Sequence, residues 1–132
     1  MANEEVFVDS DILIWHLKAM PQIVAEVNAL TSKSLLYTSP IVVAEIFAGA
    51  RKREEVIIRN MFSSIYVVKV NAEIGETAGK FLNNFSKSHD LKIADAIIAA
   101  SSLYSKMKLW TLNKKHYPML SKKDFYEINL MK

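Results

Sequence analysis

Three acidic residues stand where a carboxylate is costly unless it has a function. Asp9 directly follows the apolar run Val6–Val8, which has the pattern of a strand covered on both faces. Glu45 lies in an apolar helical stretch, and its neighbours three and four positions away are all apolar or small. Asp95 lies in a similar apolar run. We therefore expect Glu45 and Asp95 to lie on inward helix faces near the strand end that carries Asp9.

Three carboxylates at one strand end would repel one another strongly unless a cation neutralised them. Mg²⁺ and Mn²⁺ are hard cations that take oxygen ligands, and such a site can activate water and stabilise the phosphate during phosphodiester hydrolysis. The chain has no cysteine, which excludes disulfides and thiolate metal sites. The residue types therefore indicate a metal-dependent hydrolase that uses Asp9, Glu45 and Asp95.

Each carboxylate also has an ordinary structural interpretation. Asp9 could cap a helix or a turn, and Asp11 is better explained as the N-cap of the first helix. Glu45 could form a salt bridge with a nearby lysine or arginine. Asp95 would be favoured by the helix dipole in a first turn, or could pair with Lys92. Taken alone, none of these residues identifies a site.

The elements that must position these residues are short strands alternating with helices. Apolar runs predict about five strands, and helical periodicity predicts six helices, with Ser10 or Asp11, Ser39 before Pro40, and Asn71 as start signals. The strands are expected at residues 6–8, 35–38, 66–70, 109–111 and 126–128, and the helices at 12–18, 22–30, 40–49, 54–62, 72–88 and 93–106. This alternation predicts an α/β protein with three α/β/α layers and a mostly parallel central sheet, whose chemistry lies at the carboxyl ends of the strands.

The bulk composition suits one globular domain spanning residues 1–132. About half of the residues are apolar, and the formal net charge of +3 is compatible with a polyanionic partner. No apolar run approaches the roughly 18 residues of a membrane span, and the start of the chain does not read as a signal peptide. We expect a cytoplasmic protein without a membrane partner.

Three segments together resemble the PIN domain family. These are VFVDSDILIWHL around Asp9, SPIVVAEIFAGARK around Glu45, and LKIADAIIAASSLYSKMKLWTLNKKHY around Asp95, and they occur in the family's order and at its intervals. The short format is similar to the VapC-type toxins of VapBC toxin–antitoxin pairs.

The resemblance implies a Mg²⁺- or Mn²⁺-dependent endoribonuclease that cleaves RNA with a metal-activated water, leaving a 5′-phosphate and a 3′-hydroxyl. Asp9, Glu45 and Asp95 would be the catalytic, metal-binding residues, with Glu45 acting directly or through water. The resemblance also implies a homodimer that is silenced by a VapB-type antitoxin.

The sequence departs from the family after its last strand, where a fourth acidic residue is frequent. Asn113 or His116 occupies that place, so Asn113 could hold a water and His116 could contact phosphate. Thr111 belongs to the same candidate substrate-binding segment. We also expect Lys114 and Lys115 to attract RNA phosphates, so that charge reversal there weakens RNA binding.

Two other functions remain open from the sequence. Asp9-Ser10-Asp11-Ile12 resembles the nucleophile motif of haloacid dehalogenase phosphatases, with Thr38 or Ser39 ending the next strand, but that function leaves Glu45 unexplained. The missing fourth acid instead motivates a PIN-like module that binds RNA or protein without cutting. A nuclease that processes RNA outside a toxin pair is a further variant.

Overall fold

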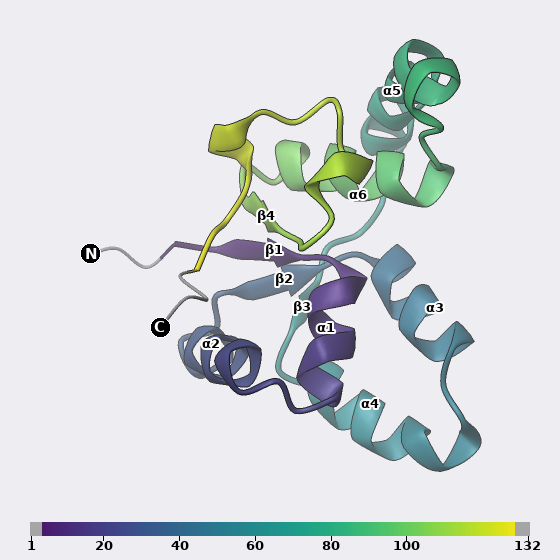
Figure 1. Ribbon diagram of the computed structural model, residues 1–132. Coiled ribbons are helices and arrows are strands. Elements are labelled where there is room, and N and C mark those ends of the chain that lie inside the picture. Colours follow the sequence, from purple (N-terminus) through teal and green to yellow (C-terminus); the bar gives the residue numbers. More distant parts are fainter. Residues whose placement is uncertain (1–3, 129–132) are drawn as a thin grey trace.

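The computed structural model describes residues 4–128, in which short strands alternate with helices (Figure 1). In chain order the elements are β1 (Val6–Val8), α1 (Ser10–Leu17), α2 (Pro21–Ser32), β2 (Leu36–Thr38), α3 (Pro40–Ala48), α4 (Glu55–Phe62), β3 (Tyr66–Val67), α5 (Ala72–His89), α6 (Ile93–Tyr104) and β4 (Lys108–Trp110), with short 3-10 helices at Lys52–Glu54, Lys114–His116 and Lys122–Asp124.

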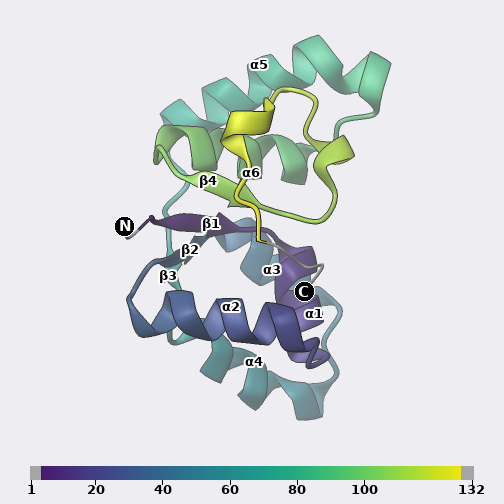
Figure 2. The same ribbon diagram turned by 60° about the vertical axis from the view of Figure 1, so that its left-hand side comes forward.

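The strands form a sheet in the order β3-β2-β1-β4, and every neighbouring pair is parallel. All three residues of the central strand β1 are fully buried, as its unbroken apolar pattern predicts. Helices α5 and α6 lie on one side of the sheet, and α1, α2 and α4 lie on the other (Figures 1 and 2). The α/β/α layering and the parallel sheet are confirmed.

The predicted fifth strand at residues 126–128 is wrong, because the described chain contains a sheet of four strands. The segment meets β4 only through an isolated bridge between Leu109 and Phe125 and one hydrogen bond, 2.8 Å long, from the Tyr126 amide to the Leu109 carbonyl. The Tyr126 side chain instead reaches Glu26 on α2 and packs edge-on against Trp110. These side-chain contacts hold the segment beside the sheet without a continuous ladder.

The starts of the helices follow local capping chemistry. The Ser39 hydroxyl accepts a 3.0 Å hydrogen bond from the Ile41 amide, and Asn71 Oδ1 accepts one of 2.9 Å from the Ile74 amide, so both predicted N-caps are confirmed. The first helix differs, because Asp9 is its N-cap and accepts a 2.7 Å hydrogen bond from the Ser10 amide. The prediction of Ser10 or Asp11 as N-cap is therefore wrong, and α1 begins two residues earlier than expected.

The main core surrounds β1 and contains Ile12 and Leu13 from α1 together with Ile98 and Ala99 from α6. A second apolar cluster joins α5 to the opposite side of α6. Helix α6 is therefore packed on two sides, which fixes the position of its first turn beside the end of β1. Within residues 4–128, no helix is both long enough and apolar enough to cross a membrane.

Candidate active site

The sheet register brings Asp9 and Thr111 together at the carboxyl ends of β1 and β4. Val8 lies opposite Trp110, and the Asp9 amide donates a 3.0 Å hydrogen bond to the Trp110 carbonyl. Asp9 Oδ2 then accepts hydrogen bonds from the Thr111 hydroxyl at 2.9 Å and from the Tyr117 hydroxyl at 2.7 Å. All three residues are buried. The Asp9 carboxylate is thus held in one orientation by groups from both ends of the chain.

Asp11 has two very different carboxylate oxygens. Its Oδ2 accepts hydrogen bonds from the Leu112 amide at 2.9 Å, the Asn113 side-chain amide at 3.0 Å and the Thr111 hydroxyl at 3.2 Å. Its Oδ1 is buried and receives no hydrogen bond of acceptable geometry. Burial, followed by the charge of Asp9, raises the pKa of Asp11. Asp11 is therefore part of the site and not the helix cap that the sequence suggested.

Glu45 lies at the open edge of this group, on α3. Its side chain is exposed, and α3 buries Val42 and Ile46 instead, so the expected inward position of Glu45 is wrong. Partial desolvation, followed by the negative charges of Asp9, Asp95 and Asp11, raises the pKa of Glu45, while a hydrogen bond with Ser10 lowers it. No lysine or arginine within residues 4–128 forms an ion pair with Glu45. The salt-bridge alternative therefore finds no support in the described chain.

Asp95 enters the site from the first turn of α6 and is half-buried. Burial and then the Asp9 charge raise its pKa, whereas His116, Tyr117 and Lys92 lower it. Lys92 forms its ion pair with Asp90, at 3.1 Å, and not with Asp95. Asp95 therefore combines a favourable place at a helix N-terminus with a position among other carboxylates.

We call these four residues, Asp9, Asp11, Glu45 and Asp95, the acidic site. Among the described residues, no three acidic or histidine side chains converge closely enough to form a ready-made metal cage. The site nevertheless suits a cation such as Mg²⁺, which keeps several waters and uses only one or two carboxylates. The buried, unpartnered oxygen of Asp11 is the observation that most directly fits a bound cation.

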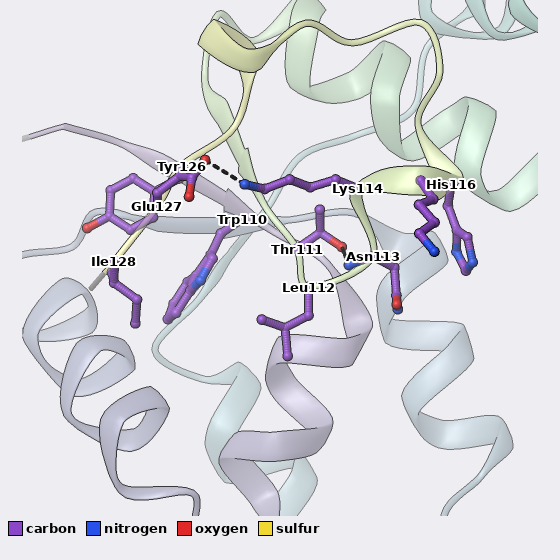
Figure 3. Close-up of a pocket in the computed structure, with 10 residues that line it drawn as sticks. Trp110, Thr111, Leu112, Asn113, Lys114, His116, Tyr126, Glu127 and Ile128 are labelled. Carbon is purple, nitrogen blue, oxygen red and sulfur yellow. Dashed lines mark hydrogen bonds and ion pairs between the residues drawn. The ribbon is translucent and has the colours of Figure 1, made fainter. Parts of the chain in front are cut away.

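The predicted substrate-binding segment runs from the acidic site along one wall of a cavity of about 630 Å³ (Figure 3). Thr111 and Asn113 hydrogen-bond within the acidic site, and His116 lies close enough to Asp95 to lower its pKa. Lys114 is less available than expected, because it forms an ion pair with Glu127 across the cavity. Lys115, the other lysine of the segment, is exposed and makes no ion pair within the described chain.

Sequence reasoning missed the roles of two residues. Asp11 was singled out only as a helix cap, because its partners lie about a hundred positions away in the chain. Tyr117 gave no signal, since nothing in the sequence places its hydroxyl beside Asp9, which lies 108 positions earlier in the chain. The structure shows instead that its buried hydroxyl points at Asp9, and the surrounding acids and burial raise its pKa, so it remains a proton donor.

The chain is similar in sequence and in fold to known proteins. The sequence model of the PIN domain matches residues 6–119. Ribonuclease VapC10 of Mycobacterium tuberculosis is 29% identical over 115 residues, which cover 86% of each chain. The solved DNA-bound VapBC of Salmonella typhimurium aligns with a TM-score of 0.74 at 19% identity, over 86% of this chain and 90% of that one. VapBC-1 of nontypeable Haemophilus influenzae aligns with a TM-score of 0.68 at 27% identity, over 85% and 89%. The chain belongs to the PIN domain family.

Proposed function

We propose that this protein is a divalent-metal-dependent endoribonuclease and the toxin of a VapBC-type pair, acting in the cytoplasm as a homodimer. The observation that carries the activity is the acidic site, in which Asp9 at the end of β1 lies close enough to Glu45 on α3 and to Asp95 on α6 for its charge to help raise the pKa values of both. The named relative VapC10 is a ribonuclease, which supports RNA as the substrate. A phosphatase of the haloacid dehalogenase type would leave Glu45 without a role.

The residues of the site have different roles in the proposed phosphodiester hydrolysis. Mg²⁺ or Mn²⁺, when bound, supplies positive charge for the phosphate and lowers the pKa of a water molecule. Asp9 and Asp95 would hold the cation, and Glu45 would contribute directly or through water. Thr111 and Tyr117 fix the orientation of the Asp9 carboxylate through their hydroxyl groups. The family resemblance predicts products with a 5′-phosphate and a 3′-hydroxyl.

The activity can be tested with a mixed tRNA and mRNA substrate in Mg²⁺, Mn²⁺ or EDTA. We expect metal-dependent cutting by the wild type and its loss in Asp9→Asn, Glu45→Gln and Asp95→Asn. Glu76→Gln is the matched control, because Glu76 is exposed on α5 and pairs only with Lys80. Activity that survives all three site variants would contradict the proposed site, and a wild type inert with every RNA and metal would favour a non-catalytic binding module.

The surface best suited to the antitoxin is an apolar groove of about 410 Å³ between α1, α3 and α4. Its lining includes Ile14, Ile46, Ile57 and Glu45, so a segment lying in the groove would contact the acidic site at Glu45. Solved VapBC complexes with the same fold support an antitoxin as the partner. The exposed Ile57 can be tested as Ile57→Asp, which should weaken antitoxin binding without changing RNA cleavage by the free toxin. Unchanged antitoxin binding would place the partner elsewhere.

A further inference from the structure

Asp11 holds one carboxylate oxygen in place and leaves the other free. Three donors from consecutive residues after β4 converge on Oδ2, at 2.9, 3.0 and 3.2 Å. Oδ1 is buried yet has no hydrogen-bond donor. The side chain is therefore fixed in orientation, with a single oxygen available to a ligand.

The environment of the free oxygen favours a cation as that ligand. A buried carboxylate oxygen without a partner is unfavourable, and the Asp9 carboxylate is close enough to share the Thr111 hydroxyl with Asp11. No lysine, arginine or histidine within the described residues forms an ion pair with Asp11. A water molecule could satisfy the oxygen but would not relieve the repulsion from Asp9, whereas a divalent cation does both.

Asp11 also accounts for the acid that is absent at position 113. The Asn113 side-chain amide donates directly to Asp11, so the two residues form an acid–amide pair across the ends of β1 and β4. In such a pair one member carries the negative charge and the other supplies the hydrogen bond that orients it. Here the charge is on Asp11 and the amide is on Asn113.

We propose that Asp11 is a fourth acidic ligand of the metal site, binding the cation through Oδ1 directly or through one water, with Asn113 as its positioning residue. The inference rests on the proposed metal-dependent function and extends it by one ligand. It differs from a purely structural role, in which Asp11 only ties the segment after β4 to α1. The structural role needs only the three bonds to Oδ2, whereas the ligand role needs a negative oxygen at Oδ1.

The variant Asp11→Asn separates these two roles. The asparagine oxygen can keep the three hydrogen bonds at the Oδ2 position, while an amide nitrogen replaces the free Oδ1. Binding of Mn²⁺ alone, measured by titration calorimetry at neutral pH, should weaken by roughly 10-fold or more. Urea unfolding in EDTA should show a variant at least as stable as the wild type, because repulsion between positions 9 and 11 is removed. Glu76→Gln is the matched control, since Glu76 is exposed on α5 and pairs with Lys80.

The double variant Asp11→Asn/Asn113→Asp moves the carboxylate to the other member of the pair. Recovery of Mn²⁺ affinity to within about threefold of the wild type supports the ligand role. The inference is overturned if Asp11→Asn binds Mn²⁺ as tightly as the wild type, or if the double variant shows no recovery. Both outcomes count only if the wild-type protein binds Mn²⁺ and cleaves RNA in the same conditions. A wild type that does neither overturns the proposed function itself, and Asp9→Asn, which should abolish binding, confirms that the titration reports on this site.

Discussion

The Thr111 hydroxyl is the donor shared by the two carboxylates at the end of β1, and Thr111→Val removes it while keeping the shape of the side chain. A hydroxyl has one proton, so the bonds to Asp9 at 2.9 Å and Asp11 at 3.2 Å count as one charge-assisted bond with a weaker second branch. Such a bond stabilises a fold by about 1.5–3 kcal/mol. Both acceptors retain other donors, so we expect a loss near the lower end, of about 2 kcal/mol.

Urea unfolding in EDTA at pH 7 measures this loss as a fall of the midpoint by about 1 M. The hydroxyl favours the ionised form of Asp11, so this part of its contribution is present above the folded-state pKa of Asp11 and should disappear as the pH falls through it. Thr31→Val is the control, because Thr31 is a partly exposed threonine whose hydroxyl bonds only to a carbonyl of its own helix. A Thr111→Val protein as stable as the wild type at pH 7 would refute the view that this hydroxyl anchors the site.

Three further predictions concern single groups around the site. Asp95 has a folded-state pKa raised above 3.8, so in metal-free protein its ionisation costs stability as the pH rises from 3.8 to the folded-state pKa. Asp95→Asn should therefore gain stability relative to the wild type as the pH rises from 3 to 7 in urea unfolding with EDTA, and a constant difference over this whole range would contradict the prediction. Glu127→Gln should free Lys114 from its ion pair, so RNA binding should tighten and the slope of log K against log salt should steepen by about 0.7, whereas an unchanged slope would mean that Lys114 does not meet phosphate. Tyr117→Phe should lower the free energy of unfolding by about 1.5 kcal/mol and weaken Mn²⁺ binding. The control Tyr126→Phe loses a hydrogen bond to a carboxylate outside the acidic site and should leave Mn²⁺ binding unchanged. Equal effects of the two variants on Mn²⁺ binding would argue against a role for the Tyr117 hydroxyl.

Most of the fold could be predicted because local signals and the tertiary structure agree. The apolar run before Asp9, the Ser39-Pro40 helix start and the Asn71 cap each determine an element within a few residues of chain, and all three are confirmed. The strand predicted at residues 126–128 failed because its alternation of side chains satisfies contacts with α2 and Trp110, not a backbone ladder. Periodicity describes which side chains are covered and does not say which groups cover them.

The site was only partly predictable for the same reason. The identity of the acidic residues follows from their unlikely positions in apolar runs, but their partners come from distant parts of the chain. Asp11 meets the segment after β4 only because the parallel register aligns Val8 with Trp110. A helix cap and a site residue look alike until that register is known.

The exposure of Glu45 changes the physical account of the site. Partial desolvation makes the largest contribution to its raised pKa, and the charges of three other acids add to the shift although the side chain lies at an open edge. The site is therefore a concentration of negative charge that an RNA phosphate can approach from solvent. Apart from the four residues of the acidic site, the sequence has 17 basic residues and 10 of its 14 acidic ones, which gives an excess of positive charge. The rest of the molecule therefore attracts a polyanion. The basic surface attracts RNA, whereas the acidic site repels its phosphates until a bound cation neutralises the carboxylates. We therefore expect RNA and metal to strengthen each other's binding.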